Sequence, residues 1–437
     1  MKTIVSKFGG SSLADAAQFQ KVAAILRSNP SRCYAVASAP GKRDSTDTKV
    51  TDLLYRCFDL AVVGNKFEPV LAQIRARFEE IVADLGISFD LDSEFSAIEQ
   101  RLRSEPQRDY LASRGEYLNS KILAAYLGWD FCDAAQAIRF SPDGVFDEAQ
   151  TDRLLGAALR RSSHAVLPGF YGADETGTIH TFSRGGSDVS GSLAACAVGA
   201  DIYENWTDVS GMLFTDPRVV ENPRTIDFVT YQELRELSYM GASVLHEDAV
   251  FPVRKARISI NVRNTNRPED PGTMIVSAMP SGTNRSPVTG VAGKKGFANV
   301  LVEKAMMNAE VGFGARLLSI FSSHGVPFEH CPTGIDTMSV VVDEEAFEQH
   351  RAEILDAVQK QLEPDSVKVE TGLSMIAVVG CGMIECKGIA SRVLGAVSKA
   401  GVNIRMIDQG SSELNIILGV DTEDYEAAVR GLCSEFC

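Results

Sequence analysis

An internal repeat in the last third of the chain is the feature that most constrains its fold. One copy begins at Gly325-Val326 with GVPFEHCPTGIDTMSVVVD, and the other begins at Gly401-Val402 with GVNIRMIDQGSSELNIILGVD. Around both starting points, short β-rich runs alternate with amphipathic helical stretches in the order strand, helix, strand, strand, helix. This order predicts two ferredoxin-like βαββαβ units, of which the first is complete over residues 297–371.

The second unit lacks its last strand, because the sequence stops after the helix predicted from Tyr425. An open sheet edge at that place would be a liability. One β-capable run, Val288–Ala292, is left unassigned ahead of the first unit. We therefore expect this run to cross over and complete the second unit, which then consists of residues 285–296 and 372–437, with the first unit inserted into it.

The first 282 residues alternate β-rich runs with amphipathic stretches, which predicts an α/β domain with a parallel or mixed sheet between two layers of helices. The strands expected in this sheet are Thr3–Phe8, Tyr34–Ser38, Ala165–Pro168, Ile202–Trp206 and Ile258–Val262.

Two local signals refine this picture. Ser12 precedes a helical stretch, and Asp15 stands three residues later, which predicts a capping box at the helix start. The stretch from Arg267 to Ser286 is rich in Pro, Gly, Ser and Thr, and we expect it to be the linker that ends the α/β domain.

Composition excludes several classes of partner. The chain has 437 residues, with 58 acidic and 43 basic side chains, so its formal net charge is −15. Nucleic acids and anionic membranes select basic surfaces, so neither is expected as a partner. No apolar run approaches the roughly 18–20 residues of a membrane span, and the N-terminus has no signal-peptide core. The nine cysteines are scattered, which is typical of reduced thiols in a cytoplasmic protein, and no structural metal site is expected.

Two paired-glycine loops carry the strongest chemical signal. KFGGSS, from Lys7 to Ser12, follows a predicted strand, and SRGGSD, from Ser183 to Asp188, opens an Ala-rich helix. Glycines let a backbone approach a phosphate closely, a helix N-terminus offers free N–H donors, and lysine adds a point charge. Asp188 could hold Lys7 or a magnesium ion, while Arg184 suits a carboxylate. Taken alone, either loop could also be an ordinary turn.

Three further segments add polar side chains. WTDVSGMLFTDPR, from Trp206 to Arg218, has the composition of a loop that covers a nucleotide. SAPGKR begins at Ser38 and leads to Thr51, and SRGEYLNS carries Glu116 on an otherwise apolar helical face. Each segment alone fits a plain structural reading, as a turn, a cap or a salt-bridged residue.

Taken in order, these segments resemble the aspartate kinases of the amino-acid kinase superfamily, and the resemblance covers essentially the whole chain. KFGGSS, RGGSD and TDVSGMLFTDPR match the family's motifs, as do YQELRELSYMGASVLH at Tyr231–His246 and VRNTNRPEDPGT at Val262–Thr273. The C-terminal repeat resembles the tandem ACT domains of these enzymes. The resemblance therefore implies an amino-acid kinase fold followed by two ACT domains, one inserted into the other.

The resemblance also implies roles for individual residues. Lys7 and Asp188 would be catalytic, and the cofactor would be Mg²⁺ brought in with ATP, without a protein metal site. The substrate-binding residues would be Ser38, Thr51, Glu116, Phe170 and Arg184. The nucleotide-binding residues would be Lys7, Gly9, Gly10, Ser187, Thr207, Asp208 and Arg218. Ser243 and Glu247 depart from the family pattern, which has a lysine and often a proline at these places.

The ACT pair implies feedback by a free amino acid and a homodimer through these domains, with a tetramer as the larger alternative. By family position, the effector-binding residues would be Phe313, Gly314, Ala315, Phe328 and Glu329. Glu329 would meet the effector's ammonium group, which favours lysine first and threonine second.

The implied activity is ATP-dependent phosphorylation of the L-aspartate β-carboxylate, the first step of the lysine, threonine and methionine pathway. Two alternatives stay open at this point. One is a kinase for another small carboxylate or acceptor, such as glutamate, carbamate or a nucleoside monophosphate. The other is an inactive amino-acid sensor that keeps the fold.

Overall fold

The computed structural model describes residues 2–183, 185–242, 245, 247–280 and 286–437, with only the backbone of residues 247 and 248. The chain divides into two compact units. The first contains Met1–Met212, Thr225–Tyr231 and Val244–Ser281, and the second contains Leu213–Arg224, Gln232–Ser243 and Gly282–Cys437. Two segments that precede the predicted boundary at residue 282 therefore cluster with the second unit.

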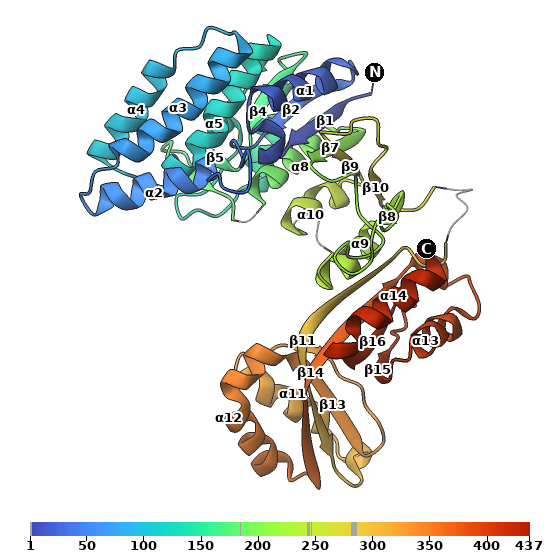
Figure 1. Cartoon of the computed structure of the whole chain (residues 1–437). Coiled ribbons are helices and arrows are strands. Elements are labelled where there is room, and N and C mark those ends of the chain that lie inside the picture. Colours follow the sequence, from blue (N-terminus) through green and yellow to red (C-terminus); the bar gives the residue numbers. More distant parts are fainter. Residues whose placement is uncertain (1, 184, 243–244, 246, 281–285) are drawn as a thin grey trace. The chain divides into compact units, whose positions relative to one another are not determined.

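The described part of the first unit is built on an eight-stranded sheet in the order β3-β4-β2-β1-β7-β9-β10-β8 (Figure 1). All neighbours are parallel except β9 and β10. The strands are β1 Ile4–Phe8, β2 Arg32–Ala37, β3 Asp130–Phe131, β4 Ala165–Pro168, β7 Ile202–Thr207, β8 Phe228–Thr230, β9 Ser259–Asn264 and β10 Thr273–Val276. A two-stranded ribbon, β5 Tyr171–Ala173 with β6 Ile179–Thr181, lies outside this sheet.

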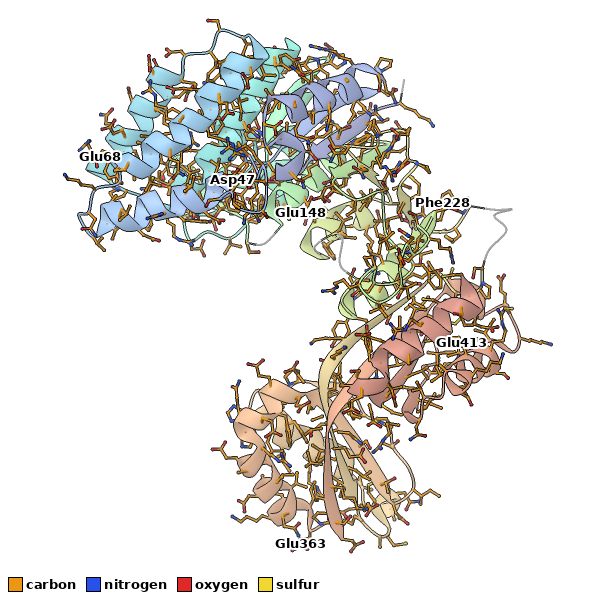
Figure 2. The ribbon with its side chains drawn as sticks, viewed as in Figure 1. Asp47, Glu68, Glu148, Phe228, Glu363 and Glu413 are labelled. Atoms are coloured by element: carbon orange, nitrogen blue, oxygen red, sulfur yellow. The ribbon has the colours of Figure 1, made fainter. Side chains whose placement is uncertain are left out.

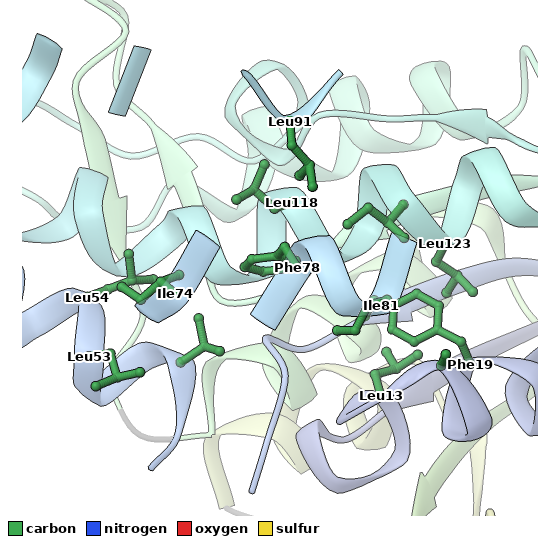
Figure 3. Close-up of a cluster of buried hydrophobic side chains, with 14 of the residues drawn as sticks. Leu13, Phe19, Leu53, Leu54, Ile74, Phe78, Ile81, Leu91, Leu118 and Leu123 are labelled. Atoms are coloured by element: carbon green, nitrogen blue, oxygen red, sulfur yellow. The ribbon is translucent and has the colours of Figure 1, made fainter. Parts of the chain in front are cut away.

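Helices pack on both faces of this sheet, as an α/β domain requires. Apolar side chains of the helices α1 to α5 join Phe8 and Trp206 of the strands in one continuous core, part of which is drawn in Figure 3. These helices are α1 Ala16–Arg27, α2 Val50–Val62, α3 Glu68–Leu85, α4 Leu91–Ser104 and α5 Arg108–Leu127. On the other face, α8 packs against β1 and β7 and is flanked by α7 and α10. The remaining helices of this unit are α6 Ala134–Ala137, α7 Glu148–Leu159, α8 Gly186–Val198 and α10 Glu247–Lys255.

Two local predictions are wrong. Asp15, not Ser12, caps α1, because its carboxylate accepts the N–H of Gln18 at 2.9 Å, while the Ser12 hydroxyl is buried against Thr265 Oγ1 at 2.7 Å. The expected linker contains β10, since Thr273–Val276 pairs with both β8 and β9. The Pro- and Gly-rich flanks of β10 concealed this strand of only four residues.

The second unit contains a six-stranded sheet among its described residues, in the order β12-β13-β11-β14-β16-β15. Its strands are β11 Gly290–Glu303, β12 Phe328–His330, β13 Thr337–Asp343, β14 Ser366–Val379, β15 Ile404–Asp408 and β16 Asn415–Asp421. Its helices are α9 Tyr231–Tyr239, α11 Phe313–Ser323, α12 Glu344–Leu362, α13 Ile389–Lys399 and α14 Tyr425–Phe436. The helices of the two repeats cover two separate apolar cores.

Two long antiparallel strands, β11 and β14, join the repeats. The second half of β11 pairs with β13 of the first repeat, and Gly290–Ala292 at its start pairs with Ala377–Val379 of the second. The run that the sequence left unassigned therefore lies beside the first strand of the second repeat, where it was expected. None of the described helices is long and apolar enough to span a membrane.

Candidate active site

An ion pair at the carboxyl end of two neighbouring parallel strands forms the centre of the candidate site. Lys7 of β1 stands beside Asn205 of β7 in the strand register, and its Nζ lies 2.6 Å from Asp188 Oδ1 in the first turn of α8. Asn205 Nδ2 donates to the same oxygen at 2.7 Å. Lys7 is 7% exposed, so its charge is held in one position by the carboxylate. The sequence offered Lys7 as one of two partners for Asp188, the other being a magnesium ion, and it missed Asn205, which stands beside Lys7 in the register of β1 and β7.

The first glycine loop is in backbone contact with the segment after β2. Gly41 N–H donates to Gly10 O at 2.9 Å, and Gly9 N–H donates to Trp206 O at 3.0 Å. A Cβ on Gly10 would lie 2.9 Å from Ala39 O, and one on Gly41 would lie 2.6 Å from the Gly10 carbonyl carbon. Any side chain here would push the two loops apart, so glycine is required for their approach.

Glu116 is buried beside these loops. Its helix, α5, approaches the segment after β2 so closely that a Cβ on Gly115 would lie 2.7 Å from Ala39 Cβ. Burial raises the pKa of Glu116 to about 8, although the Ala39 backbone and the positive charge of Lys7 oppose the shift. Its Oε2 has no hydrogen-bond partner among the described residues. A buried carboxyl group of this kind is suited to receive a cationic group, whose charge would favour the ionised form.

Ser38 and Thr51 lie near the same helix. Ser38 N–H donates to Phe8 O at 3.2 Å, and Thr51 lies in the first turn of α2, whose Val50 N–H donates to Pro40 O at 3.3 Å. Asn119 of α5 donates from Nδ2 to Ser38 O at 2.7 Å, while its buried Oδ1 has no partner in the described chain. Asn119 is a residue that the sequence analysis missed; its position three residues after Glu116 on the same helix was the available signal.

Phe170 is packed against the start of α8 in an unusual backbone conformation. Its φ is 80°, in the left-handed region that bulky residues rarely adopt. The Ser190 hydroxyl accepts its N–H at 3.0 Å, and a Cβ on Gly186 would lie 2.6 Å from the Phe170 ring. The neighbouring Ser187 is similarly close to Gly169. The second glycine loop therefore packs closely against Phe170. Strained backbone conformations of this kind often occur at functional positions.

Arg77 of α3 anchors the loops near the site and is a third residue that the sequence analysis missed. Its guanidinium donates to Ala14 O at 2.9 Å and Gly41 O at 2.7 Å, and it pairs with Asp47 at 2.6 Å. Asp47, labelled in Figure 2, also accepts from Arg43. Although burial opposes it, the hydrogen bonds and charges of these two arginines hold the pKa of Asp47 well below its usual range.

The predicted nucleotide-binding residues are distributed over both units. Thr207 ends β7, and its hydroxyl bonds to Asp208, which is exposed. Arg218 belongs to the second unit, where it is exposed and pairs with Asp216 at 2.7 Å. Arg184 and Ser243 lie outside the described residues, as does the side chain of Glu247. Within the described parts of the chain, no cluster of three His, Cys, Asp or Glu side chains could hold a metal ion.

The predicted effector-binding residues lie in the first repeat of the second unit. Phe313 is 3% exposed and its ring belongs to the core of that repeat, while Gly314 and Ala315 continue the first turn of α11. Phe328 is half exposed on β12. The Glu329 carboxylate accepts a hydrogen bond from the hydroxyl of Tyr239 on α9. Burial and this bond raise the pKa of Tyr239 to about 12.

Comparison with known proteins adds independent information. Residues 2–264 match the amino acid kinase family and residues 376–436 match the ACT domain. The chain is 37% identical to Aspartokinase 3 of Bacillus subtilis (strain 168), over 99% of this chain and 98% of that protein.

Solved structures agree with this relationship. The crystal structure of Clostridium acetobutylicum aspartate kinase has a TM-score of 0.92 and 48% sequence identity, and the match covers 100% of both chains. Two solved structures of E. coli aspartokinase III, which is 25% identical to this chain, also match. Its complex with aspartate and ADP has a TM-score of 0.71 and covers 99% of each chain, and its complex with lysine and aspartate has a TM-score of 0.73 and covers 100% of each.

The raised pKa of Glu116 predicts a dependence of stability on pH. From the ordinary value of 4.5 up to about 8, the folded protein keeps a proton on Glu116 that the unfolded chain has released. Raising the pH through this window therefore lowers the free energy of unfolding, with a slope that approaches about 1.4 kcal/mol per pH unit. Glu116→Gln should lack this component, as measured by urea unfolding between pH 5 and 8.

Glu105→Gln, at a side chain that is 68% exposed, is the matched control and should retain the slope of the unmodified protein. Parallel pH profiles for Glu116→Gln and the unmodified protein would show that Glu116 is not the titrating group.

Proposed function

The chain belongs to the amino acid kinase family, and within it to the aspartokinases, and on this premise we propose that it transfers the γ-phosphoryl group of ATP to the β-carboxylate of L-aspartate. The observation that carries the proposal is the Lys7–Asp188 pair at 2.6 Å. It lies at the carboxyl end of a parallel strand, where ligands of open α/β sheets bind, and two glycine loops and the buried Glu116 are close to it.

The chemistry needs no general base. The β-carboxylate of aspartate has a pKa of about 3.9 and is ionised at neutral pH. One of its oxygens attacks the γ-phosphorus, the bond from that phosphorus to the β-γ bridging oxygen breaks, and ADP leaves with the electron pair. The obstacle is repulsion between two anions, and preorganised positive charge lowers it. Lys7 supplies this charge, and Asp188 and Asn205 hold the ammonium group in place.

The two ends of the amino acid need different partners. In our proposal the Glu116 carboxylate receives the α-ammonium group, which supplies the cation that its unpartnered Oε2 lacks. Ser38, Thr51 and Phe170 would line the pocket. Arg184 would bind the α-carboxylate, because a guanidinium can donate two parallel hydrogen bonds to a carboxylate. Asn119 would position Ser38 through its hydrogen bond to the Ser38 carbonyl.

The nucleotide would be bound by the glycine loop and the residues after β7. Gly9 and Gly10 offer close backbone approach, and Ser187, Thr207, Asp208 and Arg218 would contact the remaining groups of ATP. Magnesium is usually bound by substrate phosphates with one or two protein oxygens, and the carboxylate and hydroxyl oxygens of Asp188 and Ser187 are donors of this kind. When bound, the ion would neutralise phosphate charge.

Regulation is the second part of the proposal. The lysine complex of E. coli aspartokinase III supports an amino-acid effector for this chain, and Glu329 favours lysine before threonine. The enzyme would then catalyse the first step of the lysine, threonine and methionine pathway in the cytoplasm, as a homodimer through its ACT domains. Feedback of this kind corresponds to a coupling of about 1–3 kcal/mol between the two sites.

Aspartate-dependent turnover tests the activity directly. With Mg-ATP and L-aspartate we expect ADP release, together with an acyl phosphate that hydroxylamine traps as its hydroxamate. Lys7→Met should lower kcat by a factor of about 10²–10³, whereas Lys66→Met, at an exposed lysine, should not change it. Faster turnover of glutamate or another small acceptor would assign a different substrate. No turnover, with amino-acid binding intact, would identify an inactive sensor.

Asp188→Asn tests the role of the carboxylate. If Asp188 orients Lys7 and is not a base, kcat should fall by about tenfold or more at every pH, and the pH profile should keep its position. Asp201→Asn, just before β7 at its other end, removes a charge that contacts only Thr3 N–H in the described structure and should leave kcat unchanged. A profile that merely shifts along the pH axis would contradict the orienting role.

Glu329→Gln tests the effector assignment. Loss of a charged hydrogen bond to the effector's ammonium should raise the lysine concentration for half-inhibition by about tenfold or more, with kcat unchanged in the absence of lysine. Tyr239→Phe, which removes the hydroxyl that donates to Glu329, is the matched variant and should not weaken inhibition by lysine. Unchanged inhibition in Glu329→Gln, or inhibition by threonine alone, would refute the assignment.

A further inference from the structure

A cavity lies in the first unit, beside α1. Its volume is about 610 Å³. Side chains of Lys21, Arg32, Trp206, Arg263 and Asn266 line it, and no Asp or Glu is among the described residues of its wall. A wall with three basic side chains and no acid is unexpected in a chain whose net charge is −15.

One buried carboxylate behind the cavity is fully engaged. Glu204 accepts hydrogen bonds from Arg32 Nε at 2.8 Å, Trp206 Nε1 at 2.8 Å and Ser6 Oγ at 2.9 Å. The Arg32 guanidinium also donates hydrogen bonds to Glu204 Oε1 and to the Ile25 carbonyl oxygen. Glu204 therefore neutralises Arg32 and has little capacity left for a second cation.

Arg263 is that second cation. Its Nη1 comes only within 3.9 Å of Glu204, and its Nη2 donates to the neutral carbonyl oxygens of Pro268 and Asp270. Its Nε is buried and has no hydrogen-bond partner among the described residues. The guanidinium lies over the Trp206 ring, 4.6 Å from its centroid. A buried N–H without a partner is costly, and an acceptor atom of a ligand would remove that cost.

Lys21 adds charge at the rim. Its Nζ donates to Asn266 Oδ1 at 2.8 Å, which is a neutral partner and does not cancel the charge. The cavity thus combines two incompletely neutralised cations with amide groups that can bind oxygen atoms.

We propose that this cavity binds a small anion, a carboxylate or phosphate group carried by a metabolite, with Arg263 and Lys21 as its principal contacts. The site is distinct from that of Lys7. Successive residues of a strand face opposite sides, so Glu204 and Trp206 face α1 whereas Asn205 faces Asp188 on α8. The proposal rests on these contacts and not on the kinase activity, and its test measures binding alone.

Trp206 provides the readout, because the chain has only one other tryptophan, Trp129. In full-length protein carrying Trp129→Phe, Trp206 fluorescence is titrated with sodium phosphate, with sodium succinate, and with sodium chloride at matched ionic strength. We expect a saturable change with phosphate or succinate and none with chloride. Saturation by one probe alone identifies the anionic group that the site prefers.

Variants in the Trp129→Phe background locate the binding. Arg263→Met and Lys21→Gln should each weaken it by about tenfold. Arg267→Gln, just after β9 but 68% exposed and paired with Asp270, is the matched control and should bind as before, and so should Lys7→Met. Lys21 is exposed on α1, so Lys21→Gln remains informative if Arg263→Met does not fold.

Three results would overturn the proposal. The first is the absence of a saturable change with either probe. The second is equal weakening by Arg267→Gln, which would indicate nonspecific charge attraction. The third is a signal that disappears in Lys7→Met and persists in Lys21→Gln, which would place the anion in the Lys7 site.

Discussion

The parallel register of β1 and β7 is the constraint on which the candidate site depends. It sets Lys7 beside Asn205, and the first turn of α8 then brings Asp188 within 2.6 Å of the lysine. A lysine that is 7% exposed would be costly without a charged partner. The ion pair therefore requires that α8 stay in place relative to the sheet. The helices packed on both faces of the sheet hold it there.

Close backbone approach is the second requirement, and it explains why glycines recur around the site. Gly10 and Gly41 bring two loops into direct contact, and Gly115 lets α5 carry Glu116 to the same place. The contact also produces the unusual state of Glu116, because a helix that packs this tightly excludes water from its carboxylate. The pKa of about 8 is thus a consequence of burial in a closely packed region, and the positive charge of Lys7 offsets it only in part.

The sequence predicted the local elements well where the pattern was long and periodic, as for α13, expected and found at Ile389–Lys399. It singled out Lys7 and Asp188 because both belong to recognisable loops, and it offered Lys7 and a magnesium ion as alternative partners of Asp188. It missed Arg77 and Asn205, which carry no motif and become functional candidates only through long-range contacts, and it missed Asn119, which stands in SRGEYLNS three residues after Glu116. It misplaced the helix cap because Ser12 is buried against Thr265, about 250 residues away in sequence, and a contact at that separation leaves no local signal.

The matched span of the amino acid kinase family and the compact units of the fold do not coincide. Leu213–Arg224 and most of α9 fall within residues 2–264 but cluster with the second unit. There, Val291 N–H donates to Phe214 O at 2.7 Å, and Glu233 accepts from Thr289 Oγ1 and from Cys381 N–H, both at 2.7 Å. These bonds attach the chain that follows β7 to β11 and to the start of the second repeat. The chain that continues from Thr207 and Asp208 is therefore bonded, from Leu213 to Arg224 and again in α9, to strands and loops of the second unit.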